Sequence, residues 1–153
     1  MQRSDRITSQ LGVVVVDHGS RRAEANQLMQ EVARCLRDAL GMTNIEPAHM
    51  DLAEPSVAAA FDRCVASGAR TVVVVPYFLG SGRHVEEDIP HLAAEAAAKH
   101  PHIEHRIASP LGLHPLIMGV IRQRIEECTA QDVSAQDVSD SADCGDVDDL
   151  TAC

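Results

Sequence analysis

The hydrophobic pattern of the chain is dominated by two runs of four consecutive valines, at residues 13–16 and 72–75. Uninterrupted apolar runs of this length favour strands that are buried on both faces, as in a parallel sheet covered by helices. Two further strands are predicted, from Ile45 to about Met50 and from Ile103 to about Ser109. We therefore expect four strands.

A segment with apolar residues at helical spacing follows each strand. The expected helices cover residues 25–40, ended by Gly41; a segment opened by Pro55 and ended by Gly68; about 88–99; and a segment that opens near Pro115. The last helix is expected to pack through Leu116, Ile117, Val120, Ile121 and Ile125. Alternating strands and helices predict an α/β fold, with a single four-stranded parallel sheet in the order 2-1-3-4 and helices on both faces.

Charge and composition divide the 153-residue chain in two. Residues 126–153 hold nine of the 23 acidic residues and no Lys or Arg, so most of the net charge of −10 belongs to this end. The pentapeptide AQDVS occurs at 130–134 and again at 135–139. Such a composition cannot bury enough apolar surface to fold alone. We predict a folded domain over residues 1–128 and a disordered acidic tail over 129–153.

Composition also argues against several functions and locations. The nearly neutral body offers no basic face, so a nucleic-acid partner is not expected. No apolar run approaches the roughly 20 residues that span a bilayer, and the first ten residues lack the apolar core of a signal peptide. A soluble cytoplasmic protein is expected, with no membrane partner. The odd number of cysteines argues against a disulfide framework, and Cys35 and Cys64 are expected in the core.

Two histidines follow the valine-rich strands, His18 directly and His84 after a short loop. In the order 2-1-3-4 these strands are neighbours, and the winding reverses between them, which is where open α/β sheets bind ligands. Two imidazoles at one crevice, with the carboxylates of residues 86–88 beside them, suit Fe, Co, Ni or Zn ions. Each histidine alone could be a turn residue, and residues 19–22 could instead receive an anion at a helix amino terminus.

Several other polar residues are weaker candidates. The second strand closes at the same edge with His49, Met50, Asp51 and Glu54. Glu54 could equally have a capping or surface role, because it stands before a proline that opens a helix. His114 leaves the fourth strand there and is expected to be structural. His100, His102 and His105 lie at the opposite end of the sheet, where a solvated loop is expected. The loop of residues 77–83 holds Tyr77, Phe78 and two glycines, so it either contacts a flat apolar ligand or packs its aromatic rings into the core.

Four segments resemble the small sirohydrochlorin chelatases, which insert cobalt or iron into sirohydrochlorin: VVVVDHGSRRAEAN, EPAHMDLAEPS, VVVVPYFLGSGRHVEEDIP and ASPLGLHP. The resemblance runs from about Leu11 to Cys128. It implies that His18 and His84 bind the incoming metal and that the protein is a homodimer. It also implies that the tetrapyrrole is contacted by Glu54, Leu79, Gly80, Ser81, Gly82, Arg83 and His84. Because some members act in plastids, the plastid stroma is the alternative location.

Metal insertion removes two pyrrole protons and moves a divalent ion, Fe²⁺ or Co²⁺, from protein ligands to four ring nitrogens. It requires a weakly held ion with open coordination positions and a nearby proton acceptor. His84, Glu87 or Glu54 could accept protons, so the expected catalytic residues are His18, His84 and Glu87. The carboxylates of sirohydrochlorin could be anchored by Arg21, Arg22 and Arg83. The sequence does not choose between iron and cobalt.

The tail is similar to that of plastid-type iron-inserting members, which hold an iron–sulfur cluster with four cysteines. Here Cys128, Cys144 and Cys153 could be ligands, but Val147 stands where the second cysteine of a C-x-x-C would fall. Such clusters normally take four thiolates, so a cluster is doubtful.

Two other functions remain open. The histidines could belong to a metal carrier without catalysis. They could also belong to a phosphoryl-transfer enzyme, although Asp17 stands where histidine phosphatases have an arginine.

Overall fold

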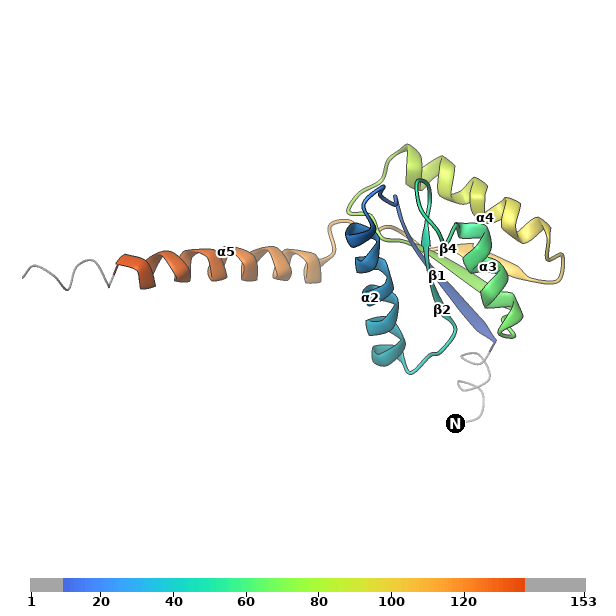
Figure 1. Ribbon diagram of the computed structural model, residues 1–153, viewed down its shortest axis with the longest axis horizontal. Coiled ribbons are helices and arrows are strands. Elements are labelled where there is room, and N and C mark those ends of the chain that lie inside the picture. Colours follow the sequence, from blue (N-terminus) through green and yellow to red (C-terminus); the bar gives the residue numbers. More distant parts are fainter. Residues whose placement is uncertain (1–9, 137–153) are drawn as a thin grey trace, which may run out of the picture. The chain divides into compact units, whose positions relative to one another are not determined.

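The computed structural model describes residues 10–136 of the chain. Its sheet has four strands, β1 (Leu11–Asp17), β2 (Ile45–His49), β3 (Thr71–Pro76) and β4 (Glu104–Ile107). Every pair is parallel and the order is β2-β1-β3-β4, which confirms the predicted topology (Figure 1). At the carboxyl edge Asp17 pairs with His49, and Val16 pairs with Pro76. The loops that follow β1, β2 and β3 therefore leave the sheet side by side.

The helices of this unit are α2 (Ala23–Leu40), α3 (Val57–Ala66) and α4 (Ile89–Ala98), the last preceded by a π-helical turn, η1 (His84–Asp88). Gly41 ends α2 with a positive φ of 63°, as expected for a glycine cap. The prediction that Pro55 opens the second helix is wrong, because the Ser56 side chain accepts the N–H of Ala59 and α3 begins at Val57. The π-helical turn was not predicted.

The helices cover both faces of the sheet, α2 on one side and α3 with α4 on the other (Figure 1). Val14 and Val16 face α3 and α4, whereas Val13 and Val15 face α2. β1 is therefore buried on both faces, as predicted. In β3 only alternate residues are buried, because α2 packs on β1 and β2 and does not extend over the same face of β3.

The two helical cysteines differ from each other. Cys64 is buried, as predicted, and burial raises the pKa of its thiol to about 12. Cys35 is exposed, so its predicted place in the core is wrong. The buried residues of α2 are Met29 and Ala33, and Cys35 lies two residues beyond Ala33, about 200° around the helix from it.

A separate unit begins at His114, and its described part is the helix α5 (Pro115–Gln136). The helix begins at Pro115 as predicted and continues past residue 128, the predicted end of the folded domain. Its apolar side chains at 116, 120, 121 and 125 are exposed within this unit, and their predicted packing stays a prediction. The rest of the predicted tail, 137–153, lies outside the described residues. Among the described helices none has the length and apolar character needed to cross a membrane.

Candidate metal and substrate site

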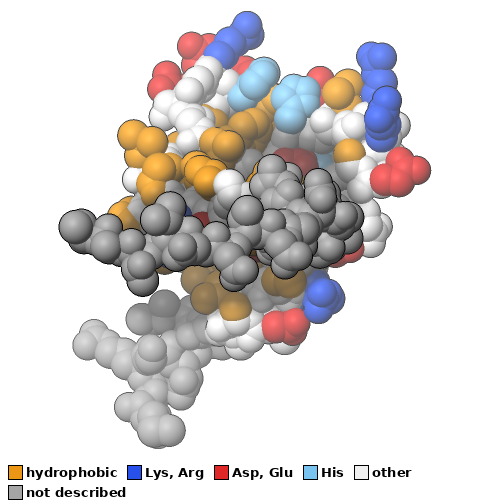
Figure 2. All heavy atoms as spheres, turned by 90° about the vertical axis from the view of Figure 1, so that its left-hand side faces the viewer, with side chains coloured by type: hydrophobic (Ala, Val, Ile, Leu, Met, Phe, Trp, Pro, Cys, Tyr) orange, Lys and Arg blue, Asp and Glu red, His pale blue; other side chains and the backbone are white. Residues whose placement is uncertain are grey.

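His18 and His84 lie together at the carboxyl edge of the sheet, as the topology predicted. The centroids of their rings are 5.2 Å apart and the planes are inclined by 74°. On the face shown in Figure 2, histidine side chains lie side by side at the surface, next to a group of hydrophobic side chains. The two loops therefore bring their imidazoles into one place even though the residues are far apart in the sequence.

The loop that carries His18 is held by tight backbone contacts. Gly19 has a φ of 85°, and its N–H donates to the Asp17 carboxylate at 3.0 Å. A Cβ on Gly19 would stand 2.0 Å from the carbonyl oxygen of Asp51, so only glycine fits here. His18 is therefore fixed against the loop that follows β2.

His84 begins the π-helical turn, and its Nδ1 lies 2.7 Å from a carboxylate oxygen of Asp88. Nδ1 of His18 lies 3.2 Å from the carbonyl oxygen of Gly19. Because an ionised carboxylate and a carbonyl only accept hydrogen bonds, Nδ1 is the donor in both rings, and a neutral ring then keeps its lone pair on Nε2. Partners of this kind orient metal-binding histidines in many proteins. Neutral imidazoles held in this way would bind a metal through Nε2.

Both histidines line one open cavity of about 280 Å³. Its other lining residues are Met50, Asp51, Asp88, His91 and Leu92. Asp51 is among the residues that the sequence placed at this edge after the second strand, whereas His91, seven residues after His84, was not identified. Among the described residues, no group of three or more His, Cys, Asp or Glu side chains is arranged to hold an ion. The histidine pair would therefore leave several coordination positions open.

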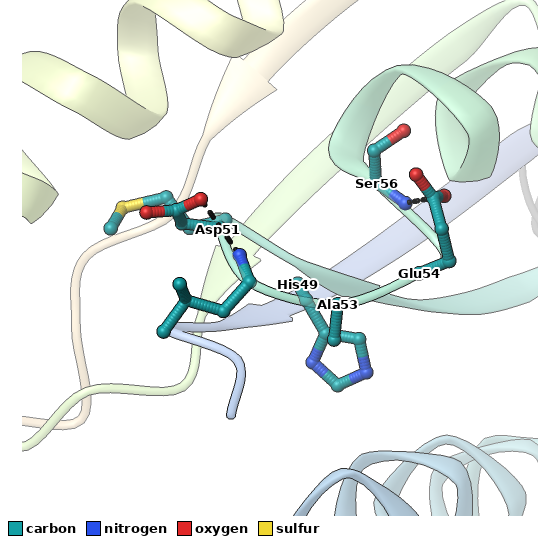
Figure 3. Close-up of a pocket in the computed structure, with 7 residues that line it drawn as sticks. His49, Asp51, Ala53, Glu54 and Ser56 are labelled. Carbon is teal, nitrogen blue, oxygen red and sulfur yellow. Dashed lines mark hydrogen bonds between the residues drawn. The ribbon is translucent and has the colours of Figure 1, made fainter. Parts of the chain in front are cut away.

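A second hollow of about 520 Å³ adjoins the first and shares Met50 and Asp51 with it. It is formed by the loop after β2, where Asp51 and Glu54 stand at opposite ends (Figure 3). The Glu54 carboxylate accepts the N–H of Ser56 at 2.7 Å, and Ser56 is the residue that caps α3. Glu54 lines this second hollow and not the cavity of the two histidines.

A buried pair supports the site from beneath. Nδ1 of His49 lies 2.6 Å from the Asp17 carboxylate, and the His49 side chain is fully buried. Its Nε2 has no hydrogen-bond partner in the described structure. The same carboxylate oxygen of Asp17 accepts the N–H of Gly19, so His49 helps to position the loop that carries His18. Both residues stand at predicted strand ends, which places them at one edge of the sheet but does not predict that they pair.

The other predicted site residues do not line the cavity. Glu87 is 72% exposed and lies 3.7 Å from Arg83, which is also 3.9 Å from Asp88. Leu79 is 70% exposed, and Gly80, Ser81 and Gly82 lie beside it in an exposed loop. Arg21 and Arg22 are exposed just before α2. Of the two aromatic residues that precede this loop, Phe78 packs against the core and Tyr77 is exposed.

The remaining histidine and cysteine candidates have local surroundings. His100 lies 2.7 Å from the Asp62 carboxylate and stacks on Phe61, as expected for a structural residue. Nδ1 of His114 accepts the N–H of Leu116 at the start of α5. Cys128 is exposed on α5, whereas Cys144 and Cys153 lie outside the described residues. The three tail cysteines are one thiolate short of the four that an iron–sulfur cluster takes, so they do not fit a cluster within one chain.

The sequence and the fold were compared with those of known proteins. The family model CbiX matches residues 12–128. The chain is 47% identical over 117 residues to the chloroplastic sirohydrochlorin ferrochelatase of Arabidopsis thaliana, a match that covers 76% of this chain and 52% of the plant protein. It is 30% identical over 142 residues to the sirohydrochlorin cobaltochelatase of Methanopyrus kandleri, covering 80% of this chain and 99% of that protein.

A solved structure of the sirohydrochlorin chelatase SirB from Bacillus subtilis subspecies spizizenii, in complex with cobalt, matches with a TM-score of 0.73 and 27% identity. The match covers 77% of this chain and 50% of that one. The chain thus spans about half the length of SirB and of the plant relative, and nearly the whole length of the Methanopyrus kandleri relative.

Proposed function

The chain belongs to the CbiX family, and from this premise we propose that it is a sirohydrochlorin chelatase, which inserts Fe²⁺ or Co²⁺ into sirohydrochlorin and releases two protons. The observation that carries the proposal is the pair of imidazoles in one cavity, each with Nε2 free to bind an ion. Similarity to both ferrochelatases and cobaltochelatases supports the reaction and leaves the ion open. The plant relative is named for iron, so Fe²⁺ is the first ion to test.

The histidine pair suits an ion that must be given up again. Two imidazole nitrogens hold a divalent ion less firmly than the four ligands of a structural site, and they leave positions for water or for ring nitrogens. As the pyrrole nitrogens bind, the bonds from Nε2 of His18 and His84 to the ion break, and the ion remains divalent throughout. Both histidines must be neutral for the ion to bind at all.

The two pyrrole protons need an acceptor in the same cavity. Asp51 lines the cavity together with both histidines, and it also lines the adjoining hollow. We infer that the Asp51 carboxylate accepts a proton, in preference to Glu87, which lies outside the lining, or to Glu54, which lies at the far end of the loop. His84 can accept the second proton once the ion has left its Nε2.

A tetrapyrrole is too large for the histidine cavity alone, so we infer that sirohydrochlorin extends over the adjoining hollow. Exposed apolar side chains, Leu52, Tyr77 and Leu79, stand at this edge and would contact the flat ring. Arg21, Arg22 and Arg83 would pair with the carboxylates of the substrate. Glu54 and the loop 79–83 keep the substrate-contacting role that the resemblance implied.

The cavity is open on one side, and we infer that a second copy of the chain completes it as a homodimer. Sedimentation velocity at micromolar concentration with sirohydrochlorin present checks this inference. We expect a dimer, and a species that stays monomeric under these conditions would contradict it.

The cytoplasm and the plastid stroma both fit this function, and similarity to a chloroplastic relative supports the second. No step of the proposed reaction depends on an iron–sulfur cluster.

Two alternatives use the same residues. A carrier would bind the ion without catalysis. A phosphoryl-transfer enzyme has less support, because Asp17 is engaged with His49 and Gly19 and no arginine precedes His18. The decisive assay follows the absorbance of sirohydrochlorin without oxygen, with Fe²⁺ or Co²⁺ in turn. A chelatase accelerates the change above the rate without protein, and a carrier does not.

A further inference from the structure

One face of η1 and α4 carries two imidazole–carboxylate pairs in tandem. Nδ1 of His84 lies 2.7 Å from Asp88, and Nε2 of His91 lies 3.3 Å from Glu95. Both pairs are separated by four residues, and the second follows the first by seven, which is about two helical turns. His91 lines the same cavity as His84 and His18, and Glu95 lines a second hollow that shares Met50 and Leu92 with this cavity.

We propose that His91 and Glu95 form a second divalent-ion site, from which the ion is passed to His18 and His84. Imidazole and carboxylate are the ligands that Fe²⁺ and Co²⁺ accept, and donors four residues apart on a helix can bind one ion together. The loading role rests on the proposed chelatase function, whereas the ion site itself does not.

The distance between the two donors fits a shared ion. Nitrogen and oxygen ligands that each lie about 2.1 Å from an ion, at angles of about 90–109°, are separated by about 3.0–3.4 Å. The 3.3 Å between His91 and Glu95 falls in this range and is long for a hydrogen bond to a carboxylate. The 2.7 Å between His84 and Asp88 is instead that of a short hydrogen bond, in which Asp88 orients His84. The same spacing along the chain thus produces two different arrangements.

The second pair is the more exposed of the two. The side chains of His91 and Glu95 are 73% and 61% exposed, against 49% and 33% for His84 and Asp88. His91 and Glu95 are therefore the more accessible of the two pairs to an ion from solution. Seven residues of helix correspond to about 10 Å, which a hydrated ion can cross within the cavity. During transfer the ion keeps its charge, its bonds to His91 and Glu95 break, and bonds to Nε2 of His18 and His84 form.

The first experiment uses Co²⁺ alone with the full chain and follows the histidine rings by ¹⁵N NMR, because bound Co²⁺ broadens the signals of its ligands. It is done in the His18→Ala/His84→Ala double variant, so that an ion at the inner pair cannot affect His91. We expect the His91 signal to broaden at Co²⁺ concentrations that leave the exposed His102 and His105 unchanged. Glu95→Gln should raise the Co²⁺ concentration at which the His91 signal is half broadened by about tenfold.

Two results of this titration would contradict the proposed ion site. If His91 broadens only together with His102 and His105, or if Glu95→Gln has no effect, the pair merely stabilises the helix and Co²⁺ binding there is adventitious.

The second experiment tests the loading role. His91→Gln should slow Co²⁺ insertion about fivefold when Co²⁺ is limiting and less when it is saturating, because an ion site of moderate affinity matters most at low ion concentration. His102→Gln makes the same change at an exposed histidine outside the cavity and should leave the rate unchanged at both concentrations. Equal rates for His91→Gln and the wild type at limiting Co²⁺ would overturn the loading role. If the wild type itself does not accelerate insertion, the proposed function fails, while the NMR result still decides the ion site.

Discussion

The hydrogen bond from His84 to Asp88 offers a quantitative test of how the metal is held. Asp88→Asn keeps the size of the side chain and removes its charge. In the native protein the carboxylate can only accept, which keeps the proton on Nδ1 and leaves Nε2 for the ion. An amide can also donate, so the ring can hold its proton on Nε2 instead, the form that cannot bind the ion.

The magnitude follows from the geometry. At 2.7 Å the bond is charge-assisted, worth about 1.5–3 kcal/mol against about 0.5–1.5 kcal/mol for a neutral one. The side chains are 49% and 33% exposed, so solvent reduces the difference to about 1 kcal/mol. That corresponds to roughly fivefold weaker Co²⁺ binding. This decrease is slightly smaller than the tenfold to hundredfold loss of metal affinity that is typical when a residue hydrogen-bonded to a metal ligand is mutated.

The assay is a calorimetric Co²⁺ titration in a His91→Gln background, so that only the inner pair is measured. Asp62→Asn is the matched control, because Asp62 forms a similar 2.7 Å contact with His100 away from the cavity. Circular dichroism verifies that both variants are folded. If Asp88→Asn binds Co²⁺ as tightly as its parent, or if Asp62→Asn weakens binding equally, the account of His84 is wrong.

Two further predictions concern the support beneath the site. Gly19→Ala should lower the free energy of unfolding by about 3 kcal/mol or more, because the added Cβ would collide with the Asp51 carbonyl at a positive φ. Gly82→Ala is the control, since its Cβ would meet open space, and it should change the free energy of unfolding by less than about 0.5 kcal/mol. Urea denaturation measures both, and equal stabilities would contradict the contact. His49→Leu should lower the free energy of unfolding by about 1 kcal/mol. The variant loses the hydrogen bond to Asp17, which stabilises the protein by more than the buried, unpartnered Nε2 destabilises it. It should also weaken Co²⁺ binding; a variant that is more stable and binds normally would show that the pair does not support the site.

The strand order and the meeting of His18 with His84 could be predicted because they follow from connectivity. Once the two valine runs are taken as neighbouring parallel strands, the loops after them must leave the same edge of the sheet. Contacts inside the loops could not be predicted in this way. Asp51 reaches the cavity through a loop in which Leu52 adopts a φ of 65°, a conformation that the sequence does not indicate.

The helical residues show the same division. The four-residue spacing of His84 and Asp88 can be read from the sequence. Their contact, however, depends on a π-helical turn, which the amino acids at 84–88 do not predict. His91 was not identified from the sequence, because the expected helix began near residue 88 and His84 was placed in the loop before it. Pairings such as His49 with Asp17 depend on register, which the length of the strands alone does not determine.

The most direct test of the central claim is the rate of metal insertion by His18→Ala and His84→Ala, measured without oxygen at saturating sirohydrochlorin. Both side chains are partly exposed at loop or turn positions, so the variants should unfold at the same urea concentration as the wild type. If the two imidazoles hold the ion that is inserted, each variant should fall to the rate seen without protein. Insertion at a near-native rate by either folded variant would contradict the proposed site.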